Sequence, residues 1–253
     1  MNIIQAIILG ILQGFTEFLP ISSSGHLVIG QKLFEIGKPL VLFDILVHVG
    51  TLSAIVLYFN KKILDFFRKI NNIKLVAVGT LPAVLVGLFL NRYIEVIFNS
   101  LSGVGFYLII TSIFLFSTKF IKKTDRKFNK LNWIDVLIIG CFQALAILPG
   151  ISRSGLTTVA GLWRGLKRKT AFVFSFYLAI PAILGALTLH TDKLLNHNGE
   201  LKNALIGFIT AAISGLLALK IFEKAVLKGK LFYFGIYCFL LGGSIVLAEF
   251  ILR

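Results

Sequence analysis

Residues 149–155 read PGISRSG, and this stretch decides how the chain folds. It interrupts an apolar segment of about 31 residues that runs from Trp133 to Trp163, whereas two membrane crossings would need about 40 residues. Because proline and glycine break helices, each side of the stretch is expected to form a short apolar helix next to a turn. The segment therefore predicts a helical hairpin in place of two spans.

The composition around this hairpin is that of a membrane protein. Of 253 residues, 57% are hydrophobic, above the roughly 45–50% that soluble domains contain. A net charge of +15 would suggest nucleic-acid binding in a soluble protein, but here the basic residues lie in short loops between apolar runs. We therefore expect one all-α membrane domain over residues 1–253 and no nucleic-acid partner.

Six other apolar runs are long enough to cross a hydrocarbon core about 30 Å thick at about 1.5 Å per residue. They lie near residues 40–59, 74–91, 101–121, 170–189, 202–222 and 231–252. Each is predicted to be a transmembrane helix.

The basic residues assign sides to these helices. Of 26 lysines and arginines, 19 lie in residues 61–74, 119–130, 164–169 and 220–230, and the positive-inside rule places these loops in the cytoplasm. Both flanks of the 133–163 hairpin are then cytoplasmic, so the hairpin is predicted to be re-entrant. Arg153 would lie inside the membrane, where an ionisable residue indicates a functional site.

A shift of 130 residues reveals a second, related break in the chain. It aligns Gly10 with Gly140, Gln13 with Gln143, Ile21 with Ile151, Ser22 with Ser152, Ser24 with Ser154 and Gly25 with Gly155. We predict two internal repeats, approximately residues 1–121 and 131–252, each with one hairpin and three crossings. An odd number of crossings inverts the second copy, so the hairpins would enter from opposite faces and their tips would meet in the bundle.

Both breaks have the features of an anion-binding site. Each places backbone N–H groups and serine hydroxyls at a helix N-terminus, where the helix dipole favours negative charge. Arg153 adds a planar guanidinium suited to phosphate. The candidate phosphate-binding residues are Arg153, Ser22, Ser24, Ser152 and Ser154, with Ser23 as a further donor. In the alternative reading, the individual serines only cap helices or fill close packing.

Gln13, Glu17 and His26 are the candidates for acid–base or metal chemistry. Gln13 and Glu17 are four residues apart, so both project from one helix face toward the first break. A buried Glu17 carboxylate must pair with Arg153, take up a proton or bind a metal. His26 is predicted to be a nucleophile or a general acid, or else to hydrogen-bond a helix start. Weaker candidates at the same helical spacing are Asp44 and His48.

The two breaks resemble the signatures of a known family, the bacitracin-resistance type undecaprenyl-diphosphate phosphatases. Residues 13–26, QGFTEFLPISSSGH, resemble its Glu/Gln-x-x-x-Glu stretch and serine-rich loop, and residues 149–157, PGISRSGLT, resemble its second signature. The similarity in segment order covers essentially the whole chain. It implies an enzyme of the bacterial cytoplasmic membrane that removes the terminal phosphate of the C55 isoprenoid diphosphate, a phosphoric anhydride. That reaction would regenerate the lipid carrier of peptidoglycan synthesis and confer bacitracin resistance.

The resemblance also implies a divalent cation, Mg²⁺ or Ca²⁺, with Glu17 and Gln13 as its candidate ligands. Glu17 would support the metal or orient the nucleophile. Either His26 or Ser23 would attack, or His26 would activate Ser23 or water. The expected partners are the polyprenyl diphosphate substrate and membrane lipids. Association of the chain into an oligomer is compatible with the sequence.

A transporter or flippase of polyprenyl phosphate is the alternative, because inverted repeats also occur in transporters. Arg153 and Glu17 would then form its substrate and proton site. A serine-rich loop that ends in histidine favours the phosphatase, since a transporter does not need one.

Overall fold

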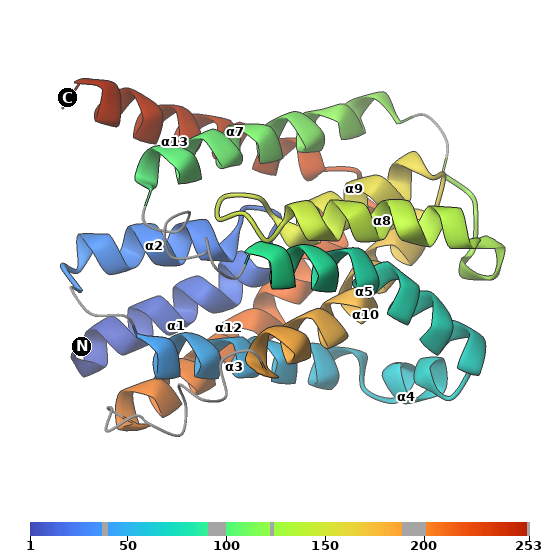
Figure 1. Cartoon of the computed structure of the whole chain (residues 1–253), viewed down its shortest axis with the longest axis horizontal. Helices are drawn as coiled ribbons and strands as arrows, with labels where there is room; N and C mark the ends of the chain where they lie inside the picture. The colour runs from blue at the N-terminus through green and yellow to red at the C-terminus, as the bar shows by residue number, and fades with distance from the viewer. Residues whose placement is uncertain (37–39, 91–99, 122–123, 189–200, 252–253) are drawn as a thin grey trace.

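The computed structural model describes residues 1–36, 40–90, 100–121, 124–188 and 201–251, and the remaining residues are not discussed (Figure 1). Within these ranges the chain is helical apart from turns and one isolated bridge between Arg126 and Leu166. Six of the described helices are long and apolar enough to cross a membrane. The prediction of an all-α, multi-pass membrane protein is confirmed.

The six long helices follow the predicted apolar runs closely. They are α3 (Val41–Phe59), α5 (Ile70–Leu90), α7 (Leu101–Ser117), α10 (Arg168–Thr188), α12 (Leu201–Leu227) and α13 (Leu231–Ile251). Three predicted run ends lie outside the described residues, namely residues 91, 189 and 252. The same is true of the basic residues Lys122 and Lys123. A short helix that the sequence did not predict, α4 (Lys61–Phe67), connects α3 to α5. Two single 3₁₀ turns, η1 (Thr118–Phe120) and η2 (Phe128–Lys130), lie between α7 and α8.

Four shorter helices form two hairpins. Residues 19–22 connect α1 (Ile3–Phe18) to α2 (Ser23–Leu33), and residues 146–152 connect α8 (Trp133–Leu145) to α9 (Arg153–Trp163). In Figure 1 the first hairpin opens toward the left end of the bundle and the second toward the right end. All four helices are shorter than the roughly 20 residues of a membrane span.

The turns of the two hairpins touch inside the bundle. The Gly150 N–H donates to Ser22 Oγ at 3.0 Å, and Ser154 Oγ donates to the Leu19 carbonyl at 3.3 Å. A methyl group added to Gly25 would lie 3.2 Å from the Gly150 nitrogen. This arrangement is compatible with the predicted re-entrant hairpins and inverted-topology repeat.

The basic loops gather at one end of the bundle. Arg126 Nη1 donates to the Arg164 carbonyl at 2.6 Å, and Arg168 Nη1 donates to the Leu227 carbonyl at 3.1 Å. Tyr177 Oη on α10 donates to the Lys62 carbonyl at 3.3 Å. The first two bonds join three of the loops that the positive-inside rule assigns to the cytoplasm, and the third ties the remaining loop to α10, at the right of Figure 1.

Glycines let each first hairpin helix approach a long helix closely. A methyl group added to Gly10 of α1 would lie 2.7 Å from the Gly207 carbonyl oxygen of α12. A methyl group added to Gly140 of α8 would lie 2.4 Å from the Gly79 carbonyl oxygen of α5. Both contacts require glycine, and they involve the positions that the 130-residue shift aligns.

Aromatic side chains fill the core beside the hairpin turns. Phe18, Phe172, Phe176 and Phe222 are fully buried. The Phe18 and Phe176 rings pack edge to face with centroids 5.5 Å apart, a favoured aromatic geometry. This cluster gives the turns a rigid apolar support.

Candidate active site

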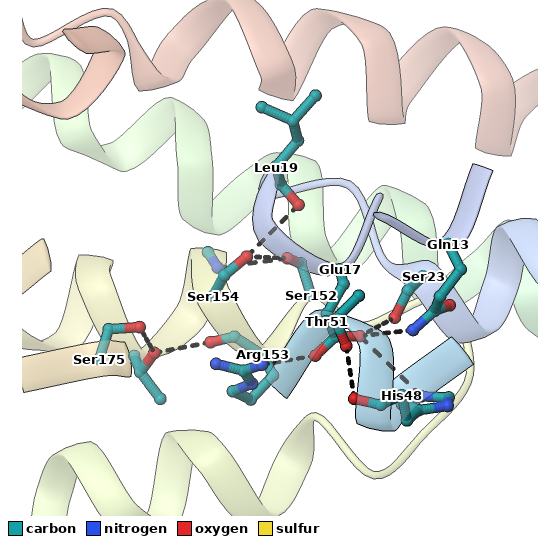
Figure 2. A network of polar contacts seen from close by, with 12 residues as sticks. Gln13, Glu17, Leu19, Ser23, His48, Thr51, Ser152, Arg153, Ser154 and Ser175 are labelled. Atoms are coloured by element: carbon teal, nitrogen blue, oxygen red, sulfur yellow. Dashed lines mark hydrogen bonds and ion pairs between the residues drawn. The ribbon is translucent and has the colours of Figure 1, made fainter. Parts of the chain in front are cut away.

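Glu17 is the centre of a buried polar network between the hairpin turns (Figure 2). Arg153 Nη2 donates to Glu17 Oε1 at 2.5 Å, and Ser23 Oγ donates to Glu17 Oε2 at 2.6 Å. Gln13 Nε2 donates to the same Oε2 at 3.2 Å. The structure thus brings together four of the residues that the sequence analysis selected.

The helices place both charges where their dipoles are unfavourable. Glu17 lies in the last turn of α1, near its negative end, and Arg153 is the first residue of α9, near its positive end. Their side chains are only 8% and 14% exposed, so neither charge is well solvated. Mutual pairing offsets part of this cost. Charged residues at the helix end that their charge disfavours are typical of functional positions.

Local sequence explains why α1 ends just after Glu17. Pro20 disfavours helical backbone at the preceding residue, and Leu19 accordingly has φ −64° and ψ 144°. The Ser22 hydroxyl then caps α2 by accepting from the Gly25 N–H. Ser23 therefore starts the second helix with its hydroxyl directed at Glu17.

Ser22 has a strained backbone, with φ +69° and ψ 101°. Residues other than glycine rarely adopt positive φ, and strain of this kind collects at functional sites. The bond from the Gly150 N–H to the Ser22 hydroxyl helps to hold this conformation. The aligned Ser152 caps α9 with an ordinary φ of −84°.

The other four predicted phosphate-binding serines lie at the contact between the turns. Ser22 Oγ is 3.4 Å from Ser24 Oγ, and Ser152 Oγ is 3.3 Å from Ser154 Oγ. Ser22 and Ser152 cap helices, and Ser22 and Ser154 bond to the opposite hairpin, which is compatible with the alternative reading. No hydrogen bond joins them to Glu17 or Arg153 side chains in the described part of the chain.

His26 makes no hydrogen bond or ion pair with Glu17, Arg153 or Ser23 in the described structure. Its Nδ1 is 2.7 Å from the Ser22 carbonyl, and its Nε2 is 2.7 Å from Tyr237 Oη on α13. Because a carbonyl only accepts, Nδ1 carries a proton. His26 thus supports the strained serine turn, and nothing in the sequence indicated Tyr237 as its partner.

His48 on α3 reaches the network instead. Its Nε2 is 4.0 Å from Glu17 Oε2, while its Nδ1 donates to the Asp44 carbonyl at 2.6 Å. The Asp44 carboxylate accepts from Gln31 Nε2 at 2.9 Å. The signal in the sequence is the i, i+4 spacing of Asp44 and His48 in an apolar run, which made them weaker candidates, and their role stays a prediction.

The donor set around Glu17 fits a hard cation bound together with a phosphate. Gln13 Oε1 and Arg153 Nη1 are buried atoms without a hydrogen-bond partner in the described structure. A carboxylate, an amide oxygen and a hydroxyl are the ligand types that Mg²⁺ and Ca²⁺ prefer. Among the described residues, no group of three or more His, Cys, Asp or Glu could hold a metal by itself. Further ligands would have to be water or substrate oxygens.

Membrane-crossing helices around a buried carboxylate, arginine and serine define a multi-pass membrane protein with an ionisable site inside the bundle. Residues 6–244 match the family model described as "Bacitracin resistance protein BacA", and the chain belongs to that family.

Similar proteins carry one recurring description. "Undecaprenyl-diphosphatase" of Carboxydothermus hydrogenoformans is 41% identical over 98% of both chains. The protein of the same description from Desulforapulum autotrophicum is 38% identical over 99% of this chain and 100% of its own. "Undecaprenyl-diphosphatase 3" of Bacillus cereus is 38% identical over 99% of this chain and 98% of its own.

Proposed function

We propose that this chain hydrolyses the terminal phosphate of undecaprenyl diphosphate in the bacterial cytoplasmic membrane. The products are inorganic phosphate and undecaprenyl monophosphate, the carrier used in peptidoglycan synthesis. Family membership and the full-length relatives support this activity. The observation that carries it is the contact of Glu17 with both Arg153 and Ser23 between the two hairpin turns.

Ser23 is the group that the geometry favours as nucleophile. Its hydroxyl already donates to Glu17 Oε2 at 2.6 Å, so the carboxylate can take the proton as the oxygen attacks phosphorus. A bond forms between Ser23 Oγ and the terminal phosphorus, and the anhydride P–O bond breaks. The lipid monophosphate leaves, and water then hydrolyses the phosphoserine to free phosphate.

Arg153 binds and neutralises the phosphate. Its Nη1 is buried without a partner while Nη2 holds Glu17, so one guanidinium can contact the phosphate and the carboxylate together. Helices α2 and α9 start at Ser23 and Arg153, so backbone N–H groups at their N-termini would add donors for the phosphate. Most of the rate enhancement in phosphoryl transfer comes from such positioning and charge neutralisation.

Glu17 and Gln13 would hold a divalent cation through oxygen atoms. Such a cation supplies charge neutralisation to the diphosphate when bound. His26 acts as a positioning residue through the Ser22 turn, because its two nitrogens contact Ser22 and Tyr237. In this proposal the two inverted repeats, approximately residues 1–121 and 131–252, supply the two hairpins.

Phosphate release from undecaprenyl diphosphate by the purified protein in detergent tests the proposal. Ser23→Ala is expected to lower kcat at least about a thousandfold without unfolding the protein. Ser244→Ala removes an exposed hydroxyl on α13 and should leave kcat unchanged. His26→Asn should retain measurable turnover; if it is inactive and Ser23→Ala active, the nucleophile is His26 or a water that it activates.

A folded wild-type protein that releases no phosphate with either Mg²⁺ or Ca²⁺ would overturn the phosphatase. Translocation of polyprenyl phosphate in proteoliposomes would then be the activity to measure.

A further inference from the structure

A groove at the basic end of the bundle lies apart from the proposed active site. It has a volume of about 410 Å³ and lies between α4, the first turns of α5 and α10, and η2. In Figure 1 these elements meet at the right end, which the positive-inside rule assigns to the cytoplasm.

The rim of the groove carries three lysines, Lys62, Lys69 and Lys169. All three are exposed, and none has an ion-pair, hydrogen-bond or aromatic partner for its ammonium group within the described structure. The one acidic residue of the groove, Asp65, lies 3.6 Å from Arg68, so its charge is partly compensated. The groove therefore has an excess of positive charge.

The floor of the groove is aromatic and rigid. The Phe66 ring contacts Tyr177 with centroids 4.2 Å apart and Phe128 with centroids 5.0 Å apart. The Tyr177 hydroxyl donates to the Lys62 carbonyl, which fixes α4 against α10. Thr170 also lines the groove, and its hydroxyl has no hydrogen-bond partner in the described chain.

Exposed apolar side chains also lie on α4 and α5, outside the lining of the groove. Leu64 is 60% exposed, Ile70 63% and Ile73 41%, all on α4 or the first turns of α5. Lysines beside exposed aliphatic groups at the end of membrane helices are placed at the level of lipid headgroups. A lipid can satisfy both parts of this surface, whereas a soluble anion contacts only the lysines.

We propose that this groove binds the headgroup of an anionic phospholipid of the cytoplasmic leaflet. The three lysines and Thr170 contact the phosphate, and the acyl chains lie along Leu64, Ile70 and Ile73. Basic pockets between helices on the cytoplasmic side recognise anionic headgroups in this way. The site does not depend on Glu17 or Arg153, so its test is independent of hydrolysis.

Native mass spectrometry of the full chain, released from nanodiscs of phosphatidylglycerol and phosphatidylcholine, tests the proposal. Wild type should retain phosphatidylglycerol over phosphatidylcholine. In a variant with Lys62→Gln, Lys69→Gln and Lys169→Gln, the ratio of bound phosphatidylglycerol to bound phosphatidylcholine should fall at least about tenfold. The corresponding triple arginine variant should keep it, because the charge remains.

The matched control changes three exposed lysines of the same end that do not line the groove, Lys167→Gln, Lys224→Gln and Lys228→Gln. Equal loss in both glutamine variants would overturn the site, because it would show a general charge effect. Displacement of the lipid by millimolar inorganic phosphate would assign the groove to free phosphate and overturn the lipid. Unchanged circular dichroism would exclude misfolding as the cause of either result.

Discussion

At the residue scale, the polar network around Glu17 combines Gln13, a neighbour on the same helix, with side chains that the fold brings in from other helices. The four-residue spacing of Gln13 and Glu17, and the ionisable Arg153 in an apolar segment, were visible without coordinates. The approach of His48 to Glu17, and of Tyr237 to His26, depends on how α3 and α13 pack. Local patterns contain no information about such packing.

Arg153→Lys is expected to lower kcat/KM for undecaprenyl diphosphate about a hundredfold. Lysine keeps the charge but cannot hold Glu17 and a phosphate oxygen with two nitrogens of one plane. Phosphate release at several substrate concentrations measures the effect. Rates equal to wild type would contradict the bidentate role of the guanidinium.

Ser22 allows backbone strain to be separated from hydrogen bonding. Both Ser22→Ala and Ser22→Gly remove the hydroxyl that accepts from the Gly150 N–H. Only glycine also relieves the positive φ, so Ser22→Gly should be more stable than Ser22→Ala by about 1 kcal/mol. Thermal unfolding in detergent measures this difference, and an identical Tm for the two variants would argue against strain.

At the element scale, hydrophobicity predicted where helices cross but not where they end. The apolar run near 202–222 underestimates α12, which continues to Leu227 because lysines end a hydrophobic run without ending a helix. The helix stops before Gly229, whose φ of +67° is typical of a C-terminal cap. Helix α4 was missed because seven residues with mixed polarity give no clear period.

The close contact between α8 and α5 is testable with a single methyl group. Gly140→Ala should destabilise the protein by about 1–3 kcal/mol, because the added carbon would lie 2.4 Å from the Gly79 carbonyl oxygen. Gly243→Ala, in α13, meets no atom within 4 Å and should leave Tm unchanged or raise it. Thermal unfolding of both variants gives the comparison.

Asp135, in the first turn of α8 at the basic end, ties the hairpin to its neighbouring loops. Arg126 Nη2 and Arg164 Nε each donate to its carboxylate at 2.6 Å. Burial would raise the pKa of Asp135, but the hydrogen bonds from Arg126 and Arg164 outweigh it and lower that pKa. The stability from this carboxylate is therefore present above its unfolded pKa of about 4 and is lost as pH falls through the folded value.

Asp135→Asn should consequently lower the free energy of unfolding by about 2–3 kcal/mol near pH 7. This loss is smaller than for a fully buried ion pair, because both arginines are partly exposed to solvent. The gap in Tm between wild type and variant should narrow as pH falls below about 4. A gap that stays constant across this range would show that the charge of Asp135 does not contribute.

At the scale of the whole molecule, the 130-residue shift predicted that the two hairpin turns meet, and the structure places them in contact. The orientation of each hairpin in the membrane remains a prediction from charge. Helix lengths alone cannot distinguish a re-entrant hairpin from a short span, because no lipid boundary is visible in a sequence.

Labelling of single cysteines with an impermeant maleimide tests that orientation. In a Cys141→Ser background, with Cys238 buried, Lys130→Cys and Lys167→Cys flank the second hairpin. Both should react only after the membrane is opened, whereas Lys32→Cys, beyond the first hairpin turn, should react in intact spheroplasts. Labelling of Lys130→Cys and Lys167→Cys from opposite sides would refute the re-entrant hairpin.

The pairing of Glu17 with Arg153 has a consequence for the order of synthesis. The two residues are 136 positions apart in the chain, so at about 5–20 residues per second Glu17 waits roughly 7 to 27 seconds for its partner. During that interval its carboxylate must stay near water or carry a proton. The proposed catalytic centre is thus completed only when the second half inserts, and a chain truncated before α9 lacks the arginine that pairs with Glu17.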